Sequence, residues 1–204
     1  MYLRELELFD FPAGKLIEFL NLMELPSLEE YRYDYHDPEF DGGDIAAGLV
    51  SLLNRSGCHL KVLKLELRVE TPAMEDIQKL LNAVPHLQEF HLKLRHPGPK
   101  TSFVMDDLFL QLSSSPPVLE GGAPGLLPDL QSLKLYSAEG YMFDCIPDIF
   151  SWPHRKMLSL QVDGSRKIVL DKDTSHKISN LIDQEFKICI LQDGRNYFSC
   201  RSLD

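Results

Sequence analysis

The chain has 204 residues, of which 44% are hydrophobic and 25% charged, as in ordinary soluble globular proteins, and this composition excludes disorder throughout. Its formal net charge of −10, without clusters of Lys and Arg, excludes phosphate-directed nucleic-acid binding, and an acidic surface favours basic partners. Because no apolar run approaches the roughly 18 residues that span a bilayer and the N-terminus lacks a secretory leader, we expect no membrane interaction and a location in the cytosol or nucleus.

A six-residue phrase with apolar residues at its first, fourth and sixth places recurs at intervals of about 30 residues, the range of solenoid units. The five strongest copies are Leu3-Leu6-Leu8, Leu28-Tyr31-Tyr33, Leu60-Leu63-Leu65, Leu87-Phe90-Leu92 and Leu130-Leu133-Leu135. Two weaker copies, Leu158-Leu160 and Ile188-Ile190, have Arg155 and Glu185 at the first place. Apolar and polar residues alternate within each phrase, which predicts a short strand with one buried face.

Helical spacing of apolar residues follows most of these strands. The clearest case is Ile77, Leu80 and Val84, with Thr71 as a cap and Pro72 in the first turn. Another helix should begin after Asp44 and end at Gly57. Further helices are expected at residues 13–25, 105–112, 142–150 and 175–186.

Strands that are each followed by a helix are expected to pair in parallel. The sequence therefore predicts an α/β solenoid at residues 1–191, with about six to seven irregular repeats, a curved parallel sheet on the concave side and helices on the convex side. Residues 113–128, rich in Ser, Pro and Gly, are expected to form a flexible insertion loop. Residues 192–204 are assigned to a C-terminal capping hairpin or tail, whereas the end before Leu3 is expected to be open, as in a fragment or a protein with an upstream domain.

The segments LPSLEEYRY, GCHLKVLKLEL, VPHLQEFHLKL and LPDLQSLKLY resemble the repeats of leucine-rich repeat proteins. LVSLLNRSGCHLKVLKLEL resembles in particular the repeats of fungal F-box proteins, in which a helix ending in Leu-Leu-x-Arg-Ser-Gly-Cys runs into the next strand. The resemblance covers most of the chain and implies the substrate-recognition part of a ubiquitin ligase receptor. The asparagine of many such repeats is missing, and the F-box that would dock the ligase adaptor has no counterpart before Leu3.

Clusters that could carry chemistry have simpler explanations. The acidic residues between Asp34 and Asp44 could bind a hard cation, but an EF-hand loop starting at Asp37 would place Gly48 where a bidentate Glu is needed. A solvated loop that leads into a helix cap is favoured, so we expect no metal and no cofactor.

Catalytic motifs are also missing from the sequence. Cys58 and His59 are sequence neighbours on a turn and should point in different directions, so they are not expected to form a nucleophile and base. We therefore expect a protein that is not an enzyme. The four cysteines are widely scattered and are expected to be reduced thiols.

The polar side of the sheet is the remaining candidate surface. Its fifth places carry Glu7, Arg32, Lys64, His91, Lys134, Ser159 and Cys189, and its seventh places carry Phe9, Asp34, Glu66, Lys93, Tyr136, Gln161 and Leu191. The expected partner-binding residues on the concave face are Glu7, Arg32, Lys64, Glu66, His91, Lys93, Lys134 and Tyr136. One alternative is a plain ladder of exposed salt bridges, such as Glu7 with Arg32, and another is a small-molecule or peptide receptor with the 113–128 loop as its lid.

Overall fold

The computed structural model describes residues 2–34, 42–67, 74–94, 101–114, 125–137, 143–164 and 168–199. Eight strands form one open sheet in chain order. They are β1 (Glu5–Phe9), β2 (Glu30–Asp34), β3 (Val62–Leu67), β4 (Glu89–Leu94), β5 (Ser132–Ser137), β6 (Ser159–Gly164), β7 (Lys187–Gln192) and β8 (Arg195–Ser199). The helices are α1 (Ala13–Leu22), α2 (Gly42–Ser56), α3 (Met74–Asn82), α4 (Thr101–Ser113), α5 (Ile146–Ser151) and α6 (Lys172–Asp183), with short 3-10 turns η1 (Phe143–Cys145) and η2 (Pro153–Arg155).

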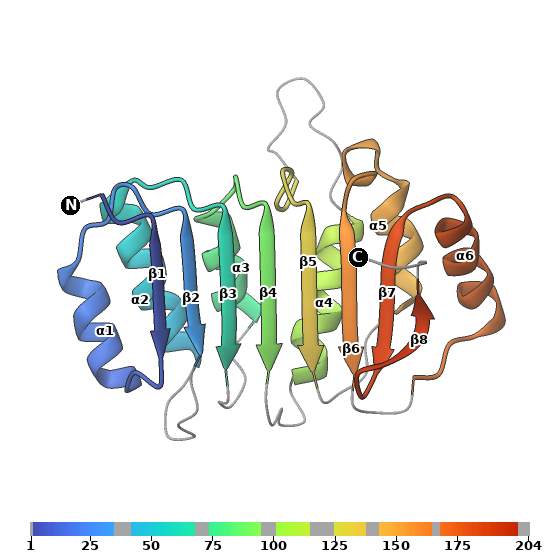
Figure 1. Cartoon of the computed structure of the whole chain (residues 1–204), viewed down its shortest axis with the longest axis horizontal. Helices are drawn as coiled ribbons and strands as arrows, with labels where there is room; N and C mark the ends of the chain where they lie inside the picture. Colours follow the sequence, from blue (N-terminus) through green and yellow to red (C-terminus); the bar gives the residue numbers. More distant parts are fainter. Residues whose placement is uncertain are drawn as a thin grey trace.

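Strands β1 to β7 are parallel, and the helices of the described ranges lie behind them on one side of the sheet (Figure 1). The core lies between the two layers. On β3, for example, Leu63, Leu65 and Leu67 are at most 3% exposed, while the residues between them face the other side. Each such leucine contributes roughly 1.5–3 kcal/mol on full burial, so the α/β arrangement of parallel strands and flanking helices predicted from the apolar phrase is confirmed.

The two ends of the sheet differ. Strand β8 pairs antiparallel with β7 through a turn at Asp193 and Gly194, both of which have positive φ, so these two strands form a hairpin. The hairpin begins at Lys187, before the expected boundary at 192, because the last parallel strand is also its first arm. At the other end, Leu6 and Leu8 on β1 are only half-buried. No helix of the described ranges is long and apolar enough to cross a membrane.

Helix boundaries follow local hydrogen bonds that apolar spacing does not reveal. Helix α6 begins at Lys172, earlier than expected, because the Asp171 carboxylate accepts hydrogen bonds from the amides of Asp173 and Thr174. Helix α2 ends before Gly57, as predicted. Gly57 itself has a φ of +56°, which glycine adopts without strain. The predicted cap at Thr71 and Pro72 lies outside the described residues, as do most of the acidic loop and most of the 113–128 insertion.

The predicted register of the sixth strand is wrong. Leu160 lies opposite Leu133, so it takes the fourth place of the phrase, and Leu158 takes the first place instead of the fourth. In the preceding unit the amides of Gln131 and Ser132 both donate to the carbonyl of Gln88. In the sixth unit only the amide of Ser159 donates to the corresponding carbonyl, that of Gln131. The sixth unit is therefore one residue shorter before its strand. Consequently the fifth and seventh places of β6 are held by Gln161 and Asp163, instead of Ser159 and Gln161.

Arg155, which had been placed at the start of the sixth phrase, is fully buried. Its guanidinium donates to the carbonyls of Leu127, at 2.7 Å, and Leu126, at 2.5 Å. Burial lowers the pKa of this guanidinium to about 10. On the same short turn, the indole Nε1 of Trp152 donates to the carbonyl of Ser113 at 2.9 Å. One turn therefore holds both the end of α4 and the segment that leads into β5.

Candidate functional site

The candidate site is the side of strands β1 to β7 that faces away from the helices, called here the open sheet face. All eight partner-binding residues predicted from the sequence lie on it. The fifth row consists of Glu7, Arg32, Lys64, His91, Lys134, Gln161 and Cys189. The seventh row consists of Phe9, Asp34, Glu66, Lys93, Tyr136, Asp163 and Leu191. Neighbouring strands lie about 4.8 Å apart, so each row is continuous across the sheet.

A third row, two residues before the fifth on each strand, was missed in the sequence analysis. It carries Glu5, Glu30, Val62, Glu89, Ser132, Ser159 and Lys187. The period of two along a strand could have identified it, because residues two apart share a face. This row supplies the carboxylates that partner much of the fifth row.

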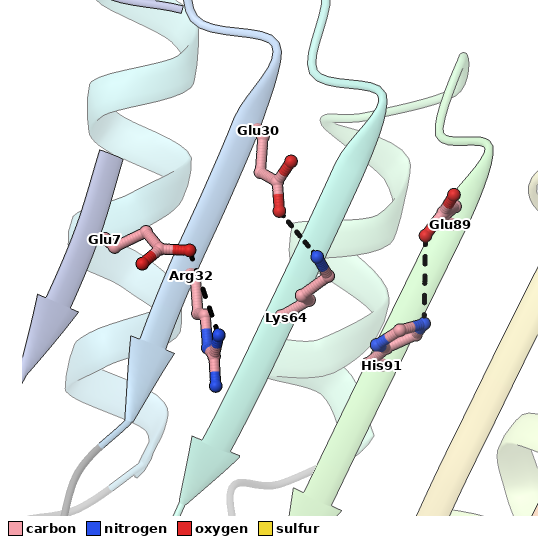
Figure 2. Close-up of polar contacts among 6 residues, drawn as sticks. All are labelled: Glu7, Glu30, Arg32, Lys64, Glu89 and His91. Atoms are coloured by element: carbon pink, nitrogen blue, oxygen red, sulfur yellow. Dashed lines mark hydrogen bonds and ion pairs between the residues drawn. The ribbon is translucent and has the colours of Figure 1, made fainter. Parts of the chain in front are cut away.

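Ion pairs cross the open sheet face between neighbouring strands (Figure 2). The Lys64 Nζ lies 2.6 Å from the Glu30 carboxylate, and Arg32 lies 3.8 Å from Glu7. Lys93 and Glu66, in the seventh row, are 3.0 Å apart. The predicted Glu7–Arg32 ladder pair is therefore present, but both side chains are more than 40% exposed, and such pairs contribute little to stability.

His91 lies in the middle of the fifth row, between Lys64 and Lys134. Burial, together with the charges of Lys134 and Lys64, lowers the pKa of this histidine to about 4, so its imidazole is neutral at pH 7. Its Nε2 is buried without a hydrogen bond and lies 3.9 Å from a Glu89 carboxylate oxygen, which is too long for one. His91 is thus a half-buried base with unused hydrogen-bonding capacity.

Tyr136 and Lys134 complete the centre of the face. Gln161 Nε2 donates to the Tyr136 hydroxyl oxygen at 3.0 Å, which leaves the phenol hydrogen free to donate. Burial and the nearby Asp163 raise the pKa of Tyr136, so the phenol stays protonated at neutral pH. Lys134 has no ion-pair partner among the described residues.

A hollow of about 430 Å³ lies over β2 to β5, and its lining includes His91 and Tyr136 but not Lys134. It opens to solvent, and its lining includes Arg32, Asp34, Lys64, Glu66, His91, Lys93 and Tyr136. Charged groups of both signs therefore surround a shallow depression on a broad surface, instead of an enclosed cavity. The lid assigned to residues 113–128 lies mostly outside the described residues.

The other clusters considered from the sequence offer less chemistry. Burial raises the pKa of the Cys58 thiol, which disfavours the thiolate that a nucleophile needs, and the ring of His59 packs edge-on against His86, with centroids 6.0 Å apart. Cys58, Cys145 and Cys189 are free thiols. Within the described ranges, no group of three or more His, Cys, Asp or Glu side chains is placed to hold a metal ion.

Comparison with known proteins identifies no relative: no family model, no curated protein and no solved structure matches the chain. The leucine-rich repeat and F-box resemblances therefore remain predictions from the residues that carry them.

Proposed function

We propose that the chain is a leucine-rich repeat module, without catalytic activity, that binds another protein across its open sheet face. The observation that carries this proposal is the continuous array of partly exposed polar side chains on seven parallel strands. Tyr and Arg are among the residues that most often dominate protein interfaces, and Tyr136 and Arg32 both lie on this face. Phe9 is 51% exposed at one end of the face, with the Arg32 guanidinium 5.0 Å from its ring centre.

The packing of the Leu-Leu-x-Arg-Ser-Gly-Cys phrase supports the repeat assignment. Leu52 and Leu53 are buried in the core, and Arg55 donates to the carbonyls of Leu20 and Met23 in the preceding unit. Ser56 Oγ accepts a hydrogen bond from the Leu25 amide at 2.9 Å. The phrase thus joins two successive strand–helix units, which is the role that stacked repeats require.

The more specific part of the proposal is that the module recognises substrates for an F-box ubiquitin ligase. This part depends on the sequence resemblance alone, and an adaptor would be bound by an F-box outside the described residues. A small-molecule or peptide receptor is a weaker alternative, because ligand pockets bury most of their ligand, whereas this hollow is open.

Bulky substitutions on the open sheet face provide the test. Ser132 and Ser159 lie half-buried in its third row, so Ser132→Trp and Ser159→Trp should obstruct a partner of any chemistry. Asn54→Trp, at an exposed position of α2, is the matched control on the helix side. Proteins captured by the wild type and by Asn54→Trp should be lost with both serine variants, while the melting temperatures stay within a few degrees. Equal capture by all four proteins would reject the face as the binding surface.

A further inference from the structure

We infer that the protein partner presents an acidic segment to the open sheet face, with a carboxylate seated beside Lys134, next to the hollow that His91 and Tyr136 line. This inference rests on the proposed function and specifies the chemistry of the partner. It depends on three observations: a row of basic residues, a cation without an ion pair in the described ranges, and a phenol whose hydrogen can be donated.

The fifth row places four basic residues on four consecutive strands. Arg32, Lys64, His91 and Lys134 lie directly opposite one another from β2 to β5, with no carboxylate among them. At about 4.8 Å per strand the row extends for roughly 14 Å, which an extended peptide of four or five residues can follow. The chain as a whole is acidic, so this row departs from the rest of its composition.

The positive charge of this row is compensated at one end and not at the other. Lys64 is held by Glu30 at 2.6 Å, and Arg32 has Glu7 at 3.8 Å. Lys134, which lies next to His91 on β5, forms no ion pair with any described residue. A carboxylate placed beside Lys134 would therefore gain a counter-charge without displacing an existing one.

One neutral group on the same strand as Lys134, the Tyr136 hydroxyl, can bind the same carboxylate. The Tyr136 hydroxyl already accepts from Gln161, so its hydrogen can be donated to a ligand oxygen. Tyr136 lies two residues after Lys134 on the same face of β5, and the His91 ring lies opposite Lys134 on β4. An ammonium and a phenol thus flank one position on the surface, with the imidazole ring on the neighbouring strand.

The overall charge of −10 opposes an acidic partner at long range, and within the hollow the carboxylates of Asp34 and Glu66 lie beside Arg32, Lys64 and Lys93. At physiological ionic strength charges are screened over about 8 Å, so the nearest groups decide the local interaction. Glu30 and Glu66 are already paired with Lys64 and Lys93. Glu89 remains near the His91 ring, and its charge would favour protonation of that ring once a ligand is bound.

Binding of an acidic segment should take up a proton at His91. The groups that face this histidine are Glu30 and Arg32 on β2, Lys64 and Glu66 on β3, Glu89 and Lys93 on β4, and Lys134 and Tyr136 on β5. In the free protein the ring is neutral above a pKa of about 4, and an adjacent carboxylate raises that pKa. Because His91 is then protonated only in the complex, the affinity for the acidic segment rises as the pH falls through the pKa that His91 has in the complex.

Fluorescence anisotropy with a labelled peptide of alternating glutamate and serine tests the inference, with the glutamine–serine peptide as control. We expect only the glutamate peptide to bind, and to bind about fourfold more tightly at about pH 6 than at about pH 8 if bound His91 titrates near 6.5. Lys134→Glu and the milder Lys134→Gln should each weaken binding, whereas Lys15→Glu, at an exposed position of α1, should not. His91→Gln should bind with no pH dependence in this range.

Equal binding of both peptides, or unchanged affinity in the two Lys134 variants, would overturn the inference. Its failure can be separated from failure of the proposed function. If Ser132→Trp and Ser159→Trp abolish partner capture while the glutamate peptide does not bind, the face is a protein-binding surface but its partner is not acidic. If the tryptophan variants capture normally, the proposed function fails first.

Discussion

Two tyrosines on β2 should respond with opposite signs to the loss of one hydroxyl group. Tyr31 and Tyr33 are both fully buried and occupy places where other units carry leucine or phenylalanine. The Tyr33 hydroxyl donates to the carbonyl of Phe11 at 3.0 Å. The Tyr31 hydroxyl has no hydrogen-bond partner among the residues that the structure describes, and burial raises its pKa far above the usual range, so it stays a neutral, unsatisfied group.

The expected free-energy changes follow from these environments. A buried hydroxyl without a partner costs about 1–3 kcal/mol, so Tyr31→Phe should raise the free energy of unfolding by about 1 kcal/mol once a small void is allowed for. Tyr33→Phe removes a hydrogen bond worth about 0.5–1.5 kcal/mol and should lower stability by about 1 kcal/mol. The two variants should therefore differ by about 2 kcal/mol, although each loses only one oxygen atom.

Urea denaturation followed by far-ultraviolet circular dichroism measures both changes on the same scale. For a chain of this size 1 kcal/mol corresponds to roughly 2–4 °C, so the melting temperatures should differ by about 4–8 °C. A loss of stability in Tyr31→Phe equal to that in Tyr33→Phe would refute the reasoning, because it would mean that the Tyr31 hydroxyl is satisfied, for example by a buried water.

Two further changes test packing of the sheet and of its helices. Leu92 is fully buried, so Leu92→Asp should destabilise the fold by about 3–5 kcal/mol, whereas Lys93→Asp, which breaks the partly exposed pair with Glu66, should cost about 1 kcal/mol or less. Equal losses in thermal melts would mean that the two faces of β4 are misassigned. Ser56→Ala should cost about 1–3 kcal/mol in urea denaturation because it leaves the buried amide of Leu25 without its acceptor, and no measurable loss would show that another group satisfies this amide.

The strands and the polar face could be predicted because both depend on a period of two. Leu63 and Leu65 point to the core while Lys64 and Glu66 do not, and the same alternation places Lys134 and Tyr136. The eight predicted partner-binding residues consequently share one surface.

The features that were not predicted depend on contacts between distant parts of the chain. The predicted register of β6 is wrong because it treats Arg155 as a polar replacement in the strand phrase, whereas Arg155 is a buried residue at the end of the preceding turn. Its burial depends on two carbonyls near residue 127, which are recognisable only in three dimensions. The neutral state of His91 likewise arises from cross-strand neighbours, whose alignment requires the correct register.

The turn that carries Trp152 and Arg155 has a consequence for the mechanics of the chain. This turn binds both the last turn of α4 and the segment that leads into β5. Extra residues inserted between Ser114 and Gly125 would therefore be held at both ends by the same turn. Length changes there should be absorbed locally, without pulling the neighbouring strands apart. Trp152 is also the chain's single tryptophan, so its fluorescence offers a built-in optical reporter of whether that junction stays closed.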